Sequence, residues 1–217
     1  MYIYYCNITI MLGWKFSYSS QNTKTDFINA PRKICIAAHS TPYIDGIVLY
    51  NALKYFDEEN PIIYVSSYCI SPYLVNWCMA ISYKGGFIQN ECTALENIPT
   101  FCRVIFPSGG TVQWKTGFYV LAKILGAKIV ILGIDYKTKR VIVDSVIDPL
   151  LGLSFEETKN ICITRLRKYE AGPLCYVLRV LCNYGCETYM FDMKTIWILR
   201  LYIIAWIVYC ISGYVLK

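Results

Sequence analysis

Residues 32–56 read RKICIAAHSTPYIDGIVLYNALKYF, and this stretch decides the fold class. Residues 32–38 form a short apolar run that ends at a Ser-Thr-Pro turn, a pattern typical of a buried β-strand. Residues 45–56 carry apolar side chains at helical spacing, and Asp45 suits the N-cap of that helix. The stretch therefore predicts a strand that passes through a short turn into a helix.

The same alternation continues along the chain. Further strands are predicted at residues 62–66, 101–106, 127–136 and 140–147, and further helices at residues 72–83, 114–125 and 154–167. Gly126 is placed to end one helix in the left-handed conformation, and Ser154 with Glu157 fits a capping box at the start of another. Residues 18–29 are the most polar stretch and predict an exposed loop. The alternation predicts an α/β fold: a central, mostly parallel sheet flanked by helices, with an antiparallel pair near its end.

Apolar residues make up 56% of the chain, and they concentrate in residues 196–216, where Arg200 is the only charge. About twenty apolar residues are needed to cross a bilayer as a helix. We therefore predict a C-terminal membrane anchor at residues 195–217 behind an α/β domain at residues 1–194. The anchor is a transmembrane helix or a helix lying on the membrane, and a buried core helix is the alternative. Residues 1–12 are a short apolar stretch that suits a membrane interface. The basic residues ahead of the anchor predict that the folded domain faces the cytosol.

The eleven cysteines are odd in number and mostly lie within apolar runs, which indicates small buried side chains in a reducing compartment. Their spacing, with a single histidine in the chain, favours no metal site. The formal charge of +6 suits an anionic membrane surface. Because the basic residues are scattered singly, the sequence predicts no nucleic-acid partner.

His39 is the only histidine, and it lies at the junction between the predicted strand and helix of residues 32–56. Histidine is the one side chain whose ordinary pKa suits proton transfer near neutral pH. Asp45 is the nearest downstream carboxylate able to orient the ring, so the pair is a candidate general base with its orienting group. The alternative is a histidine that merely forms hydrogen bonds at the junction.

Several segments follow one another in an order shared with a known family. They are Leu12-Gly13-Trp14-Lys15, residues 37–49 with His39 and Asp45, Gly85-Gly86-Phe87, FPSGGT at residues 106–111, WKTGFY at residues 114–119, and Gly133-Ile134-Asp135-Tyr136-Lys137. The ordered set resembles the glycerolipid acyltransferase family, which includes the 1-acyl-glycerol-3-phosphate acyltransferases.

The resemblance implies transfer of a fatty acyl group from a thioester donor, acyl-CoA or acyl carrier protein, to a membrane lipid hydroxyl such as that of a lysophospholipid. His39 would act as the general base and Asp45 would orient it. The substrate-binding positions would be Gly86, Ser108, Gly109, Gly110, Thr111 and Lys115. The resemblance implies no bound cofactor and no metal. From the residues alone, the two adjacent glycines fit either an anion-binding nest or a tight turn, and Lys115 fits an exposed, solvated lysine.

The chain also departs from the family pattern. His39 and Asp45 are six positions apart, one more than in the family, and Ser108 and Val112 stand where the family has glutamate and arginine. In the family, such arginines hold the acceptor phosphate. These departures leave a second hypothesis open: an inactive relative that keeps the fold and acts as a membrane-binding or scaffold protein.

Overall fold

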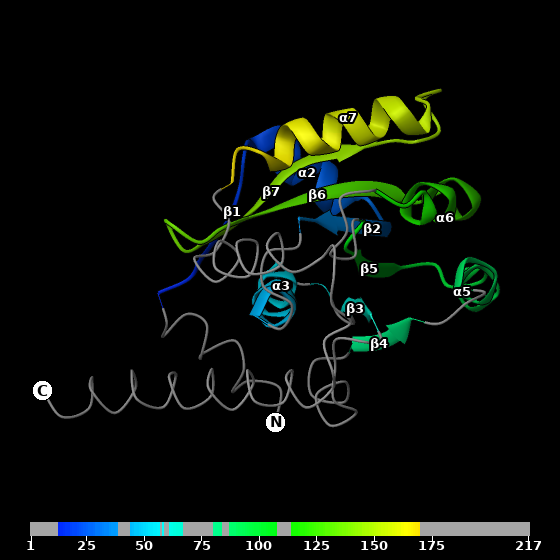
Figure 1. The fold of residues 1–217 in the computed structure, drawn as a ribbon, viewed down its shortest axis with the longest axis horizontal. Helices are drawn as coiled ribbons and strands as arrows, with labels where there is room; N and C mark the ends of the chain where they lie inside the picture. Colours follow the sequence, from blue (N-terminus) through cyan, green and yellow to red (C-terminus); the bar gives the residue numbers. More distant parts are fainter. Residues whose placement is uncertain are drawn as a thin grey trace, which may run out of the picture. The chain divides into compact units, whose positions relative to one another are not determined.

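The computed structural model describes residues 13–38, 44–56, 58, 61–66, 80–83, 87–107 and 114–169. Within these ranges, seven strands form one sheet in the order β1-β7-β6-β2-β5-β3-β4 (Figure 1). The strands are β1 (Lys15–Tyr18), β2 (Arg32–Ala37), β3 (Pro61–Ser66), β4 (Ala80–Tyr83), β5 (Phe101–Ile105), β6 (Lys128–Asp135) and β7 (Arg140–Ile147). Among the described pairings only β6 and β7 are antiparallel, and the others are parallel.

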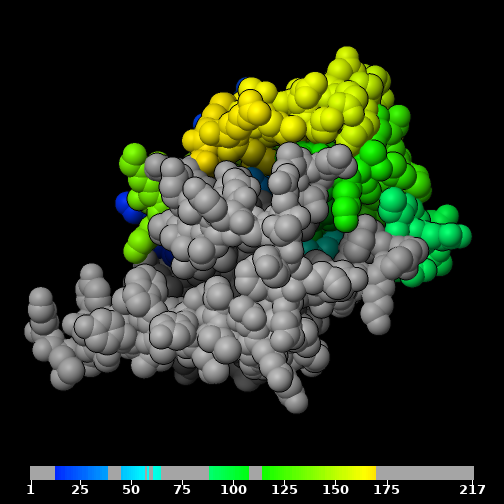
Figure 2. Space-filling model, viewed as in Figure 1, coloured from blue at the N-terminus to red at the C-terminus, as the bar shows by residue number. Residues whose placement is uncertain are grey.

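Helices cover both faces of this sheet. One face packs against α2 (Gln21–Asn29) and α3 (Ile44–Tyr55), and the other packs against α5 (Phe87–Leu95), α6 (Gly117–Leu125) and α7 (Phe155–Leu166). Figure 2 shows the outer surfaces of α5, α6 and α7 on one side of the molecule. Successive strand residues point to opposite faces, so a sheet covered on both sides needs apolar residues at nearly every position. The central strand β2 meets this need, since Ile34 and Ile36 pack on one side and Cys35 and Ala37 on the other.

The predicted α/β architecture is confirmed, including the mostly parallel sheet and the antiparallel pair near its end. The antiparallel strand at residues 140–147 was predicted at its observed bounds. Gly126 ends α6 with φ 61°, the left-handed conformation expected of a terminal glycine. Ser154 and Glu157 form the predicted capping box of α7. These local signals worked because caps depend on neighbouring residues alone.

The prediction of an exposed loop at residues 18–29 was wrong. This stretch contains the end of β1 and the whole of α2. Ser20 caps the helix by accepting a hydrogen bond from the Thr23 backbone N–H at 3.1 Å, and Phe27 anchors it in the core at 1% exposure. Thr23 and Phe27 are the buried residues of α2, and most of its other side chains are polar. A single buried ring therefore holds an otherwise polar helix against the sheet.

The predicted helix at residues 72–83 was wrong at its carboxyl end. Residues 80–83 form β4, which pairs in parallel with β3, and residues 72–79 lie outside the described residues. The helix α5 and the strand β1 were not predicted. Both are short, and both gain their stability from neighbours distant in sequence, as when β1 pairs with β7.

Three cysteines confirm the prediction of buried thiols. Cys35, Cys102 and Cys162 are buried and free of disulfides, and the Sγ atoms of Cys35 and Cys102 lie 3.6 Å apart. Burial raises the pKa of the Cys162 thiol to about 12, which keeps it protonated at neutral pH.

Within the described ranges, no helix is both long enough and apolar enough to cross a bilayer. The predicted anchor at residues 195–217 and the apolar residues 1–12 lie outside those ranges.

Position 133 of β6 requires glycine because the Tyr169 ring packs close to its backbone. A Cβ added at Gly133 would lie 2.3 Å from Cε2 of the Tyr169 ring. Tyr169 is held in place because its hydroxyl donates to Asp144 Oδ1 at 2.5 Å. Burial, with the nearby Asp144 carboxylate, raises the pKa of Tyr169 well above its usual value, so the hydroxyl stays protonated as the donor.

We therefore expect Gly133→Ala to destabilise the protein by about 1–3 kcal/mol, the usual range for overpacking a core. Urea unfolding followed by circular dichroism would measure this loss. In a Tyr169→Ala background the same glycine substitution should cost much less, because the ring that it meets is gone. An equal cost in both backgrounds would show that backbone effects, and not the ring, require the glycine.

Candidate active site at the carboxyl edge of the sheet

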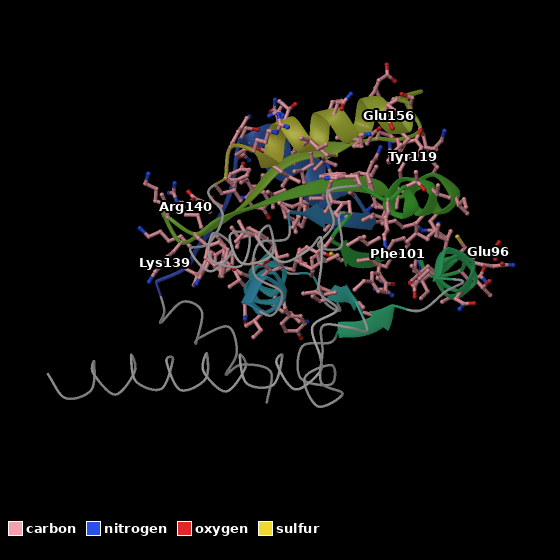
Figure 3. The ribbon with its side chains drawn as sticks, viewed as in Figure 1. Glu96, Phe101, Tyr119, Lys139, Arg140 and Glu156 are labelled. Atoms are coloured by element: carbon pink, nitrogen blue, oxygen red, sulfur yellow. The ribbon has the colours of Figure 1, made fainter. Side chains whose placement is uncertain are left out.

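The carboxyl ends of three adjacent parallel strands meet at one edge of the sheet. In their registers, Ile36 of β2 lies beside Ile105 of β5, and Ala37 of β2 lies beside Leu132 of β6. Figure 3 shows Lys139 and Arg140 in the β6–β7 hairpin at this end of the sheet, and Phe101, where β5 begins, toward the other end. Sites in open α/β sheets form outside the carboxyl ends of the strands. We therefore expect a catalytic or binding site at this edge of the sheet.

Asp45 is the buried carboxylate at this edge. It lies in the first turn of α3, is 0% exposed, and accepts a hydrogen bond from the Tyr136 hydroxyl. Because α3 begins at Ile44, Asp45 lies inside the helix, and the prediction that it is the N-cap was wrong. The first turn still favours a carboxylate, since the backbone N–H groups there carry partial positive charge. A charged group this deeply buried needs partners, and the Tyr136 hydroxyl is one.

Tyr136 is fixed from two directions. Its ring meets the Trp14 ring edge to face, with centroids 5.3 Å apart and an interplanar angle of 85°. Trp14 is itself 9% exposed and immediately precedes β1, whose first residue donates its backbone N–H to the Lys139 carbonyl at 2.8 Å. Asp135 closes the β6–β7 turn by accepting from the Thr138 hydroxyl at 2.5 Å. The turn and β1 together hold the Tyr136 hydroxyl in position to donate to Asp45.

A backbone hydrogen bond joins the residues on either side of the stretch from 108 to 114. The Lys115 backbone N–H donates to the Pro107 carbonyl at 3.0 Å, which joins the two ends of residues 108–114. The Lys115 side chain is exposed. Trp114 is anchored by its edge contact with Phe118, at a centroid distance of 5.9 Å. The helix α6 begins at Gly117, later than the predicted start at residue 114.

The structure describes two of the predicted site residues, Asp45 and Lys115. The others lie outside the described residues; they are His39, Gly86, Ser108, Gly109, Gly110 and Thr111. Sequence reasoning missed Tyr136 as a hydrogen-bond partner of Asp45 and Trp14 as the ring that packs on Tyr136. The available signal was that each lies in a segment that resembles the family, but only the order of the strands shows that these segments meet.

No group of three or more histidine, cysteine, aspartate or glutamate side chains able to hold a metal ion occurs among the described residues.

The comparison with known proteins identifies a solved structure with a similar fold. No protein-family model and no curated protein sequence matches the chain. The structure is similar to the crystal structure of the 1-acyl-sn-glycerophosphate (LPA) acyltransferase PlsC from Thermotoga maritima, with a TM-score of 0.51 and 15% sequence identity. The match covers 76% of this chain and 74% of that one. At this identity the likeness establishes a shared α/β architecture.

Proposed function

We propose that the chain is a membrane-associated acyltransferase that moves a fatty acyl group from acyl-CoA or acyl carrier protein to a lipid hydroxyl. The observation that carries this proposal is the fully buried Asp45 carboxylate at the carboxyl edge of a sheet whose fold is similar to that of an LPA acyltransferase. A carboxylate at the carboxyl ends of parallel strands lies where open α/β sheets form their sites, which favours a functional role for Asp45.

The strand registers support the choice of partners for Asp45. Ile36 and Ile105 are paired neighbours on β2 and β5. Along the chain, His39 follows Ile36 by three positions, and Ser108 follows Ile105 by three positions. Both therefore come soon after strands that end side by side. Along the chain, the proposed substrate position Gly86 follows β4, and Ser108, Gly109, Gly110, Thr111 and Lys115 follow β5.

In the proposed reaction, His39 removes the proton of the lipid hydroxyl as its oxygen attacks the thioester carbonyl carbon. Asp45 orients the imidazole and stabilises the imidazolium that forms. Collapse of the tetrahedral intermediate breaks the carbon–sulfur bond, and the imidazolium returns the proton to the departing thiolate. The products are the acylated lipid and the free thiol, and the step needs no covalent enzyme intermediate.

The test is release of free thiol from acyl-CoA by the full chain, measured with a panel of lipid acceptors and compared with His39→Ala. We expect release that depends on the acceptor and is lost in the variant. Acceptor-dependent release that persists in His39→Ala would contradict the proposed base. A wild-type chain that releases no thiol with any acceptor, while remaining folded, would favour the inactive scaffold.

We further propose that residues 195–217 anchor the protein with its folded domain facing the cytosol, where a thioester donor is available. The apolar run of residues 196–216 and the basic residues that precede it support this proposal. A truncation ending at Lys194 should lose carbonate-resistant membrane association. Unchanged association would assign the attachment to another part of the chain.

A further inference from the structure

A second candidate site lies beside α2 and reaches the amino ends of β2 and β5. It is a cavity of about 1220 Å³ whose wall includes the first residues of β5 and the carboxyl end of α3. Its wall extends along β1 to Phe16 and Tyr18, and it includes none of Asp45, Tyr136 and Lys115, the described residues around the proposed acyl-transfer site. The cavity is therefore separate from the proposed acyl-transfer site.

Five aromatic rings form one side of this cavity, and four of them contact the fifth, Phe56. The closest ring pair is Tyr18 and Phe56, with centroids 4.8 Å apart. The rings that belong to the cluster and line the cavity are Phe16, Tyr18, Phe27, Tyr55 and Phe56. Apolar side chains are also exposed around it, since Ile28 is 59%, Tyr55 53% and Ile98 37% exposed. Such a surface favours a ligand with a large apolar body.

The charges in the wall favour an anion. The Lys33 ammonium pairs with the Glu58 carboxylate at 2.7 Å and stands 4.8 Å from the centre of the Phe27 ring. An aromatic cluster can bind a cation over the face of a ring, but Lys33 already occupies this position at Phe27. Arg103 also lines the cavity, and its guanidinium lies 3.8 Å from the Glu91 carboxylate.

Of the charged residues that line the cavity in the described part of the chain, Lys24 is the one outside any ion pair. It lines the cavity from α2 on the same helix face as Phe27 and Ile28, at the spacing of three and four residues that places side chains together. Among the described residues, Lys24 has no ion-pair partner, and its side chain is exposed. One face of α2 thus presents a solvated ammonium beside the apolar rim.

We propose that this cavity binds an amphipathic monoanion, a long-chain carboxylate whose apolar chain packs on the aromatic cluster and whose carboxylate lies near Lys24. The volume exceeds the range of about 300–1,000 Å³ usual for small-molecule sites, so an extended chain fits. The inference rests on the residues that line this cavity and does not rest on the proposed acyl transfer.

Photoaffinity labelling of the full chain in lipid nanodiscs tests this proposal. The probe is a twelve-carbon carboxylate with a diazirine at the end of its chain, and the neutral comparison is the matching alcohol. Adducts are mapped by peptide mass spectrometry. We expect the carboxylate to label residues of the cavity, and excess unlabelled dodecanoate to suppress these adducts. The alcohol should label the cavity several-fold less.

Two charge-reversal variants assign the anion contact. Lys24→Glu should lower labelling of the cavity by the carboxylate about five-fold or more, since it replaces an attractive surface charge with a repulsive one. Lys168→Glu, at an exposed lysine outside the cavity lining, should leave labelling unchanged. Substitutions at both exposed positions should have little effect on stability, which circular dichroism would verify.

Three outcomes of the labelling pattern itself would overturn the proposal. They are equal labelling of the cavity by the alcohol and the carboxylate, indifference of cavity labelling to Lys24→Glu, and adducts that fall outside the cavity. A dodecyltrimethylammonium competitor that displaces the probe better than dodecanoate would also overturn it, because the site would then prefer a cation.

Discussion

Replacing His39 by alanine is expected to lower kcat for acyl transfer by about 10²–10⁴-fold, the usual contribution of a positioned general base. Asp45→Asn should cause a loss of similar order, because the amide keeps the shape of the carboxylate and removes its charge. Without that charge the imidazolium formed during attack is less stable. Steady-state kinetics with the best acceptor would measure both losses.

The pH dependence separates an electrostatic role of Asp45 from a structural one. A nearby carboxylate makes an imidazole easier to protonate. Its removal in Asp45→Asn should therefore move the acid limb of the kcat/KM profile to lower pH, since the neutral base persists there. A lower rate with an unmoved acid limb would mean that Asp45 only supports the fold.

Tyr136→Phe is the matched control for Asp45. It removes the hydroxyl that donates to the Asp45 carboxylate and keeps the ring that packs on Trp14. We expect a loss of stability of about 1–3 kcal/mol, as is usual for a hydrogen bond to a charged group. Activity should fall less than in Asp45→Asn, because the charge remains. A larger loss in Tyr136→Phe would assign the phenol itself to the reaction.

Lys33→Met is expected to destabilise the protein by about 3–5 kcal/mol, the usual cost of leaving one partner of a buried ion pair without the other. Lys33 and Glu58 lie 2.7 Å apart, and their side chains are 7% and 14% exposed. Removal of the lysine leaves the Glu58 carboxylate, which is 14% exposed, without its ion-pair partner. Denaturant unfolding of the variant would show the loss.

A double-mutant cycle distinguishes the charge effect from packing. In Lys33→Met with Glu58→Leu, both charges are replaced by apolar groups, which in other buried pairs is often neutral or stabilising. The double variant should recover most of the stability that Lys33→Met loses. If it is no more stable than the single variant, then the lost contact of Lys33 with the Phe27 ring accounts for the effect, and the ion pair does not.

The sequence by itself determined the elements whose causes are local. The apolar run at residues 32–38 gives a strand because it can be buried on both faces, as β2 is. Ser154 begins α7 and Gly126 ends α6 because a cap is made by groups within a few residues of each other. The alternation of such elements was enough to predict the mostly parallel α/β sheet.

Only the tertiary structure decided which residues meet. Tyr136 and Asp45 are 91 positions apart, and they meet because β2 and β6 are parallel neighbours whose carboxyl ends share an edge. The strand β4 forms where a helix was predicted, because β3 offers it backbone hydrogen bonds that no local propensity registers. The Lys33–Glu58 pair likewise joins a strand to the segment that follows α3. Side chains are placed by strand order and register, which follow from burial of the whole sheet and not from any one stretch of the chain.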